Sequence, residues 1–269
     1  MKDFYGKNCD AIKKKKLFLF DMDGTVYLEN TLFDGVKELC DRIVKGGGRF
    51  VFVTNNSSKS VADYAEKLRR MGLNAGEEEV YTSTLTACAM LKEKFSDQPI
   101  YAQGTRSFLQ ELKRNGVNAV TQFRENIAAV IVGFDPELTG EKLRTTCRVL
   151  TLLSVPYYAT NPDWVCPVEF GFVPDCGSMC FGIQKATGKS PEYFGKPHPY
   201  MIETLMKKFG ATKEETLVVG DRLYTDIASG VNAGVQTACV LSGESSEEDI
   251  KASSVKPDFV FESVKQMIF

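Results

Sequence analysis

Two carboxylates follow an apolar run near the start of the chain. The stretch LFLFDMDGTVY, residues 17 to 27, places Asp21 and Asp23 two positions apart, directly after four apolar residues. Two like charges that close together oppose joint ionisation. A divalent cation removes this conflict, and Mg²⁺ suits one or two carboxylates together with waters and a phosphate. The stretch therefore suggests a metal-assisted phosphate site.

Polar residues also stand at the ends of two other apolar runs. Thr54 ends RFVFVT and Asn55 follows it, whereas Asp221 follows TLVVG and Asp226 comes five residues later. Lys196 lies in GKPHP, before an amphipathic segment. Because ligands of parallel sheets bind beyond the carboxyl ends of the strands, we expect all these side chains to meet in one crevice.

This combination of groups favours phosphate chemistry. The two aspartates of the first stretch would share a Mg²⁺ ion with Asp221. Lys196 and Thr54 would orient phosphate oxygens, and Gly24 would permit a sharp turn whose N–H groups cradle the same anion. An Asp carboxylate is itself a known nucleophile for phosphorus.

Each of these residues also has a plainer interpretation. Asp21 and Asp23 would cap a strand end, and Thr54 would begin a turn. Lys196 would be an exposed surface lysine. Asp226 would be a helix N-terminal charge that the helix dipole favours. The joint occurrence of the motifs favours the functional interpretation, although the two roles of Asp226 can coexist.

Short apolar runs alternate with amphipathic segments near both ends of the chain. The predicted strands here are 16–21, 49–54, 216–220, 236–241 and 258–261, and helices are predicted at 36–45, 61–71 and 226–233. Strands that alternate with helices imply βαβ units. The runs are apolar throughout, as in strands covered on both faces. The fold class is therefore α/β, with a mostly parallel, Rossmann-like sheet as its core.

The middle of the chain contains a second, separate alternation of strands and helices. Strands are predicted at 99–102, 128–133 and 156–160, and helices at 105–114 and 140–153. Two segments rich in turn-forming residues, 94–99 and 186–191, bracket this part. We therefore predict an inserted α/β domain over 96–188, within a core built from 1–95 and 189–269.

The charge of the chain and the length of its first apolar run limit the partners and the cellular location that we expect. The chain has 269 residues, a formal charge of −2 and a pI near 5.7, so it lacks the basic field that nucleic acid or an anionic membrane would require. The first apolar run is too short for a signal peptide or a membrane span. We expect a cytoplasmic protein with no nucleic-acid or membrane partner, and the sequence leaves open whether it forms a homodimer.

Four motifs carry a family resemblance. DMDGT, TNNS, GKPHP and GDRLYTD occur in the order found in the haloacid dehalogenase superfamily of phosphohydrolases. The longer stretches GKPHPYM, VGDRLYTDIASGVNAG, VIVGFDPELT and TNPDWVCP resemble its NagD-like, 4-nitrophenylphosphatase branch. The resemblance covers nearly the whole chain from about residue 16. It implies a haloacid dehalogenase fold whose cap domain is inserted between the second and third motifs.

The resemblance also implies a role for each core residue. Asp21 would attack phosphorus, and Asp23 would protonate the leaving oxygen and then activate the hydrolytic water. Thr54 and Asn55 would hold phosphate oxygens, and Lys196 would neutralise the nucleophile and the phosphate. The Mg²⁺ ligands would be Asp21, the backbone carbonyl of Asp23 and Asp221, with support from Asp226.

The inserted domain gives weaker signals. Two turn-rich loops, 160–164 and 174–178, are expected to face the core site, and they offer Asn161, Asp163 and Asp175 as specificity candidates. Relatives often carry a small glycine-rich turn at the second loop, where this chain has Asp175 and Cys176. A carboxylate at this place would repel a phosphate, so Asp175 is proposed to accept hydrogen bonds from sugar hydroxyls.

The leading hypothesis is a Mg²⁺-dependent phosphatase that acts on phosphate monoesters of small metabolites, such as sugar phosphates or nucleotides. A phosphotransferase or mutase would use the same nucleophile but would exclude water from the intermediate. A receiver-like, non-enzymatic phosphate sensor also uses strand-end aspartates, a Thr and a Lys. The position of Asp23 and the inserted domain argue against that alternative.

Overall fold

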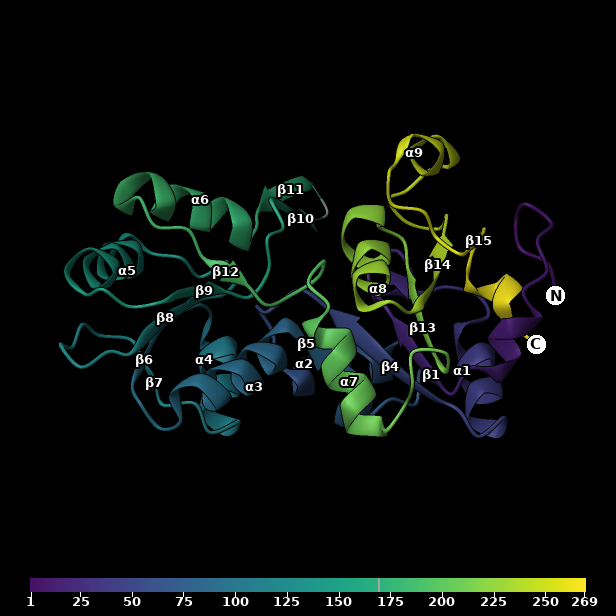
Figure 1. The fold of residues 1–269 in the computed structure, drawn as a ribbon, viewed down its shortest axis with the longest axis horizontal. Helices are drawn as coiled ribbons and strands as arrows, with labels where there is room; N and C mark the ends of the chain where they lie inside the picture. The colour runs from purple at the N-terminus through teal and green to yellow at the C-terminus, as the bar shows by residue number, and fades with distance from the viewer. Residues whose placement is uncertain (169) are drawn as a thin grey trace. The chain divides into compact units, whose positions relative to one another are not determined.

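The contacts of the chain divide it into two units. The computed structural model describes residues 1–168 and 170–269 (Figure 1). The first unit comprises 1–54, 62–81 and 196–269, and the second comprises 55–61 and 82–195. Each unit has a sheet of its own, and the strand pairs assigned in these two sheets are parallel. The predicted α/β class is therefore confirmed.

The division differs from the predicted domain boundaries. Helix α3, Ser83–Phe95, lies in the second unit, although the sequence prediction assigned it to the core. Residues 55–61 and 189–195 also belong to the second unit. The prediction followed turn-forming residues at 94–99, but α3 packs against α4, Arg106–Arg114. Helix packing, which loop composition does not report, places the boundary before α3.

The sheet of the first unit has the order β15-β14-β13-β1-β4-β5. Its strands, in chain order, are β1 (Leu17–Phe20), β4 (Arg49–Thr54), β5 (Val80–Thr82), β13 (Thr216–Gly220), β14 (Gln236–Val240) and β15 (Phe259–Phe261). All four residues of β1 are buried, as expected of a strand covered on both faces. β1 pairs in parallel with both β4 and β13, so the ends of these three strands share one edge of the sheet.

Five α-helices and a small hairpin accompany this sheet in the described part of the chain. The helices are α1 (Val36–Lys45), α2 (Val61–Arg70), α7 (Tyr200–Phe209), α8 (Ala228–Ala233) and α9 (Glu247–Ala252). The hairpin pairs β2, Tyr27–Leu28, with β3, Thr31–Leu32. A π-helical turn, Leu223–Ile227, runs directly into α8. The short 3-10 segments are Asp10–Lys14, Glu77–Glu79 and Val264–Met267.

The second unit has a five-stranded parallel sheet of order β12-β9-β8-β6-β7. The strands are β6 (Ile100–Gln103), β7 (Ala119–Val120), β8 (Ala129–Val132), β9 (Tyr157–Ala159) and β12 (Glu192–Tyr193). Figure 1 shows α5 and α6 on one side of this sheet and α3 and α4 on the other. The remaining elements are α5 (Gly140–Leu152), α6 (Cys176–Thr187) and an antiparallel hairpin of β10 (Val165–Val168) and β11 (Gly171–Pro174).

None of the helices in the described residues combines the length and the apolar character needed to cross a membrane.

Candidate active site

Three aspartates come together in the first unit. Asp21 directly follows β1, Asp221 directly follows β13, and Asp226 lies in the π-helical turn. One carboxylate oxygen from each residue lies within 4.8 Å of the others. Because β1 and β13 are parallel neighbours, both strands end at the same edge of the sheet. The structure thus brings together three of the carboxylates that the sequence placed in one crevice.

A buried lysine completes the cluster. The Lys196 ammonium lies 2.5 Å from Asp21 Oδ1 and 2.6 Å from Asp226 Oδ1. It also donates a hydrogen bond of 3.1 Å to the Val53 carbonyl. That carbonyl immediately precedes Thr54, which is buried at the end of β4. The ends of β1 and β4 and the segment around Lys196 therefore meet at one place.

The electrostatics of the cluster favour an additional cation. Burial raises the pKa of Asp21 well above its usual value, and the nearby charge of Asp226 adds to this effect while Lys196 opposes it. Burial and Asp226 also raise the pKa of Asp221 to about 6. Burial disfavours the charged form of Lys196, but the two carboxylates beside it outweigh burial and raise its pKa. Lys196 thus pairs with two of the three carboxylates, and the three together form a set of hard oxygen donors that fits Mg²⁺.

The loop after β1 leaves room for Asp221. Gly24 has a φ of +84°, and a Cβ at this position would lie 2.5 Å from Asp221 Oδ2. The same carboxylate accepts a hydrogen bond of 2.8 Å from the Glu244 N–H and one of 3.4 Å from the Thr25 hydroxyl. The turn predicted at Gly24 is present. The structure adds the steric reason for a glycine there, and the role of this turn as a phosphate cradle stays a prediction.

Two family models match the chain. The model described as haloacid dehalogenase-like hydrolase matches residues 18–118, and a HAD-hydrolase-like model matches residues 193–267. An acid sugar phosphatase from Staphylococcus aureus is 34% identical over 258 residues, which cover 96% of this chain and 98% of the relative. The chain belongs to the haloacid dehalogenase-like hydrolases.

Solved structures indicate which branch of this family the chain resembles. A 4-nitrophenylphosphatase from Thermotoga maritima is 38% identical, with a TM-score of 0.90 and coverage of 96% of this chain and 98% of that one. NagD from Escherichia coli is 31% identical, with a TM-score of 0.85 and coverage of 94% and 98%. A glycerol phosphate phosphatase from Mycobacterium tuberculosis, solved in complex with magnesium, is 28% identical, with a TM-score of 0.86 and coverage of 93% and 75%.

This haloacid dehalogenase-like hydrolase therefore falls in the NagD-like, 4-nitrophenylphosphatase branch, as its motifs predicted. It is a phosphoric monoester hydrolase. The receiver-like sensor considered from the sequence is set aside, because the relatives that match nearly the whole chain are enzymes.

Asp23 lies outside the carboxylate cluster. The clustered carboxylates among the described residues are Asp21, Asp221 and Asp226, whereas the Asp23 side chain is 46% exposed and touches Tyr27 and Lys67 instead. This placement agrees with the roles that the family resemblance implies, in which the backbone carbonyl of Asp23 would bind the metal and its side chain would transfer protons.

Asn55 has its partner in the second unit of this hydrolase. Its side-chain amide donates a hydrogen bond of 2.8 Å to Asp163 Oδ2, and the Asn161 amide donates another of 2.8 Å to the same oxygen. Asn161 also donates to Asp175 Oδ1 at 3.0 Å. Asn55 thus joins the three predicted specificity residues in one hydrogen-bonded chain, and its role as a phosphate ligand stays a prediction.

The prediction of a loop at 174–178 is wrong for its second half. Helix α6 begins at Cys176, and Asp175 is its N-cap residue, whose carboxylate accepts the Cys176 N–H. Asn161 and Asp175 are buried, so their polar atoms serve the packing of this unit. The contact of Asp175 with sugar hydroxyls stays a prediction.

Sequence reasoning missed Arg222. This partly buried guanidinium lies 2.9 Å from Glu244 Oε2. Burial disfavours its charge, but the carboxylates of Asp21 and Glu244 raise its pKa overall. The sequence does contain a feature that could have indicated Arg222, because this residue lies inside the GDRLYTD motif between Asp221 and Asp226.

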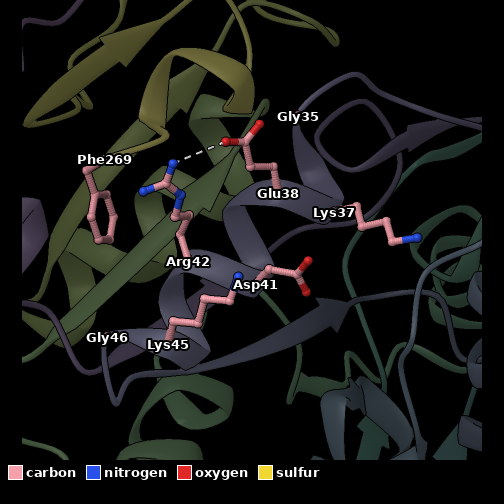
Figure 2. Close-up of a pocket in the computed structure, with 8 residues that line it drawn as sticks. All are labelled: Gly35, Lys37, Glu38, Asp41, Arg42, Lys45, Gly46 and Phe269. Atoms are coloured by element: carbon pink, nitrogen blue, oxygen red, sulfur yellow. Dashed lines mark ion pairs between the residues drawn. The ribbon is translucent and has the colours of Figure 1, made fainter.

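A surface hollow along α1 lies apart from these residues. Figure 2 shows its lining, in which Glu38 and Arg42 form an ion pair of 3.5 Å. The lining residues are Gly35, Lys37, Glu38, Asp41, Arg42, Lys45, Gly46 and Phe269. Both members of the pair are more than half exposed, so it adds little stability. None of the predicted site residues lines the hollow, and the carboxylate cluster remains the candidate active site.

Proposed function

We propose that the chain is a Mg²⁺-dependent phosphatase that hydrolyses phosphate monoesters of small metabolites through an aspartyl phosphate on Asp21. Sugar phosphates and nucleotides are the proposed substrates, and the acid sugar phosphatase relative supports the first class. The observation that carries the proposal is the Lys196 ammonium 2.5 Å from Asp21 Oδ1, with two further carboxylates beside it.

Each residue has a defined task in the reaction. Lys196 neutralises charge, so that an anionic carboxylate can approach an anionic ester. Asp21 forms a bond to phosphorus while the bond to the ester oxygen breaks, and Asp23 gives that oxygen a proton. Asp23 then takes a proton from the water that hydrolyses the aspartyl phosphate. Thr54 and Asn55 hold the remaining phosphate oxygens.

The proposed ligands of Mg²⁺ are the carboxylates of Asp21 and Asp221 and the backbone carbonyl of Asp23, with Asp226 in support. The ion supplies positive charge that stabilises the transferring phosphoryl group. The approach of three carboxylate oxygens within 4.8 Å supports this donor set, and so does the magnesium complex of the M. tuberculosis relative. We place the activity in the cytoplasm, since all eight cysteines are free thiols, as is usual in a reducing compartment.

The test is phosphate release from a panel of phosphorylated metabolites by the purified protein. Activity should require Mg²⁺, stop with EDTA and return when Mg²⁺ is added back. Asp21→Asn should lower kcat by at least about a thousandfold without unfolding the protein, because removal of a nucleophile abolishes the covalent route.

Two results would contradict the proposal. One is full activity of Asp21→Asn after mass spectrometry has excluded deamidation. The other is transfer of the phosphoryl group to an acceptor alcohol without release of phosphate, which would identify a phosphotransferase instead.

A further inference from the structure

Three side chains meet beside the carboxylate cluster, and all belong to the first unit. The Tyr27 hydroxyl donates a hydrogen bond of 3.2 Å to Asp23 Oδ2. The Lys67 ammonium lies 4.0 Å from Asp23 Oδ1. The same ammonium lies over the Tyr27 ring, 3.8 Å from its centroid. Each oxygen of the Asp23 carboxylate therefore faces a different positive or hydrogen-bonding group.

Local structure fixes the tyrosine in this group. The Gly24 N–H donates to the Tyr27 carbonyl at 2.9 Å, and the Tyr27 N–H donates to the Met22 carbonyl at 3.2 Å. Tyr27 is fully buried. Burial and the neighbouring Asp23 raise the pKa of its hydroxyl, so the hydroxyl stays protonated and remains a donor. The tyrosine therefore offers Asp23 a fixed anchor.

Lys67 comes from a distant part of the sequence. It lies on α2 and is 22% exposed in its side chain. A cation over an aromatic face is attracted by the ring quadrupole, so the Tyr27 ring holds the ammonium at the place where it also faces Asp23. Asp23 is nearly half exposed, and the Tyr27 hydroxyl holds one of its carboxylate oxygens while Lys67 faces the other.

We propose that Lys67, seated on the Tyr27 ring, is a positioning residue that orients the Asp23 carboxylate for proton transfer to the leaving oxygen. This inference rests on the proposed function, because it takes Asp23 as the acid and base of the reaction. Proton transfer depends on hydrogen-bond geometry, and a small displacement of a reacting group costs rate steeply.

The test compares two substrates of nearly equal shape, 4-nitrophenyl phosphate and phenyl phosphate, with Mg²⁺ present. The 4-nitrophenolate leaves readily without a proton, whereas phenolate needs one. Because both substrates give the same aspartyl phosphate, the comparison uses kcat/KM, which reports only the steps up to release of the phenol. Lys67→Met should lower kcat/KM for phenyl phosphate by about tenfold or more and kcat/KM for 4-nitrophenyl phosphate by less than about threefold. Lys67→Arg, which keeps the charge over the ring, should restore most of the loss.

Matched variants make the result specific. Arg70→Met removes a cation that is 78% exposed on the same helix and should leave both rates unchanged. Tyr27→Phe keeps Lys67 over the ring and removes only the hydroxyl, so it reports the separate contribution of the hydroxyl bond to Asp23. Lys67→Gln serves as the second probe if Lys67→Met does not fold.

An equal fall in kcat/KM on both substrates, or no change in kcat/KM on either, would overturn the role of Lys67. Asp23→Asn in the same assay separates this failure from that of the proposed function. If Asp23→Asn discriminates between the substrates and Lys67→Met does not, only the inference about Lys67 fails. If Asp23→Asn does not discriminate either, the assignment of Asp23 as acid and base fails as well.

Discussion

Lys196 sets the charge balance of the candidate site, because its one buried ammonium contacts both Asp21 and Asp226. Breaking a buried ion pair by removing one partner leaves an uncompensated charge, which typically costs about 3–5 kcal/mol. Asp226 therefore has a second task besides its proposed support of the metal shell, since its carboxylate also pairs with this lysine. Asp221, one of the proposed metal ligands, has the positive charge of Arg222 near it.

The raised pKa of Asp221 predicts how magnesium stabilises the protein at different pH. The folded-state pKa of about 6 lies above the ordinary value of 3.8, so the metal-free fold favours the protonated carboxyl and loses stability as pH rises between these two values. Mg²⁺ needs the ionised form and stabilises only the folded state. Calorimetry should therefore show a larger Mg²⁺-dependent rise in Tm at about pH 7.5 than at about pH 5.

The control for this pH effect is Asp221→Asn, which should abolish most of the magnesium-dependent rise at both pH values. Equal rises for the unaltered protein at the two pH values would argue that Asp221 does not limit metal binding.

At the scale of elements, the loop between β1 and β2 brings Gly24 against Asp221. A methyl group at this position would meet Asp221 Oδ2 at 2.5 Å, which is too close for a methyl carbon and an oxygen atom in van der Waals contact. Gly47, at the end of α1, also has a positive φ, of +78°, but a Cβ there would meet nothing within 4 Å. Both glycines therefore adopt a left-handed backbone conformation, but only at Gly24 would a Cβ clash with a neighbouring atom.

These two glycines give a matched pair of variants. Gly24→Ala and Gly47→Ala should both lose about 1 kcal/mol of stability from backbone strain, but only Gly24→Ala should displace Asp221 and weaken Mg²⁺. Isothermal titration with Mg²⁺ and chemical denaturation measure the two effects separately. Unchanged magnesium affinity in Gly24→Ala would show that the loop does not position this carboxylate.

The strands could be predicted from the sequence because their apolar runs are uninterrupted. The predicted bounds 49–54 and 216–220 agree with β4 and β13. Helix α6 was missed, because Gly177 and Ser178 at its start are typical of turns. Gly177 is needed there, since a Cβ would lie 2.2 Å from the Pro162 carbonyl, and a close approach of this kind is a tertiary effect that local propensity does not reveal.

The sequence predicted those residues of the candidate site that lie at the carboxyl ends of strands. Asp21, Thr54 and Asp221 each stand at the end of a run that forms a strand, so the geometry of a parallel sheet brings them together. Lys67 carries no such signal. It lies in the middle of an amphipathic helix, and only the packing of α2 against Tyr27 brings it to Asp23.

At the scale of the whole molecule, the carboxylate cluster and Lys196 belong entirely to the first unit. The second unit contains Asn55 and the hydrogen-bonded chain through Asp163. The carboxylates proposed to bind the metal and the proposed nucleophile thus belong to one unit. The specificity candidates Asn161, Asp163 and Asp175 belong to the other unit.

This division predicts where magnesium protects the backbone. Hydrogen exchange should slow on Mg²⁺ addition at the ends of β1 and β13 and at the Glu244 N–H, which donates to Asp221. Exchange in β8 of the second unit should change little. Protection centred on the second unit would contradict the assignment of the metal to the carboxylate cluster.

The central claim, that Asp21 becomes phosphorylated during turnover, can be tested most directly by reductive trapping. The protein is mixed with substrate and Mg²⁺, quenched in acid within the first turnovers and treated with borohydride, which reduces an aspartyl phosphate to homoserine. Peptide mass spectrometry should then find homoserine in place of Asp21, and not at Asp23 or Asp221. Homoserine at another aspartate, or none at Asp21 while phosphate is released in a burst, would contradict the account.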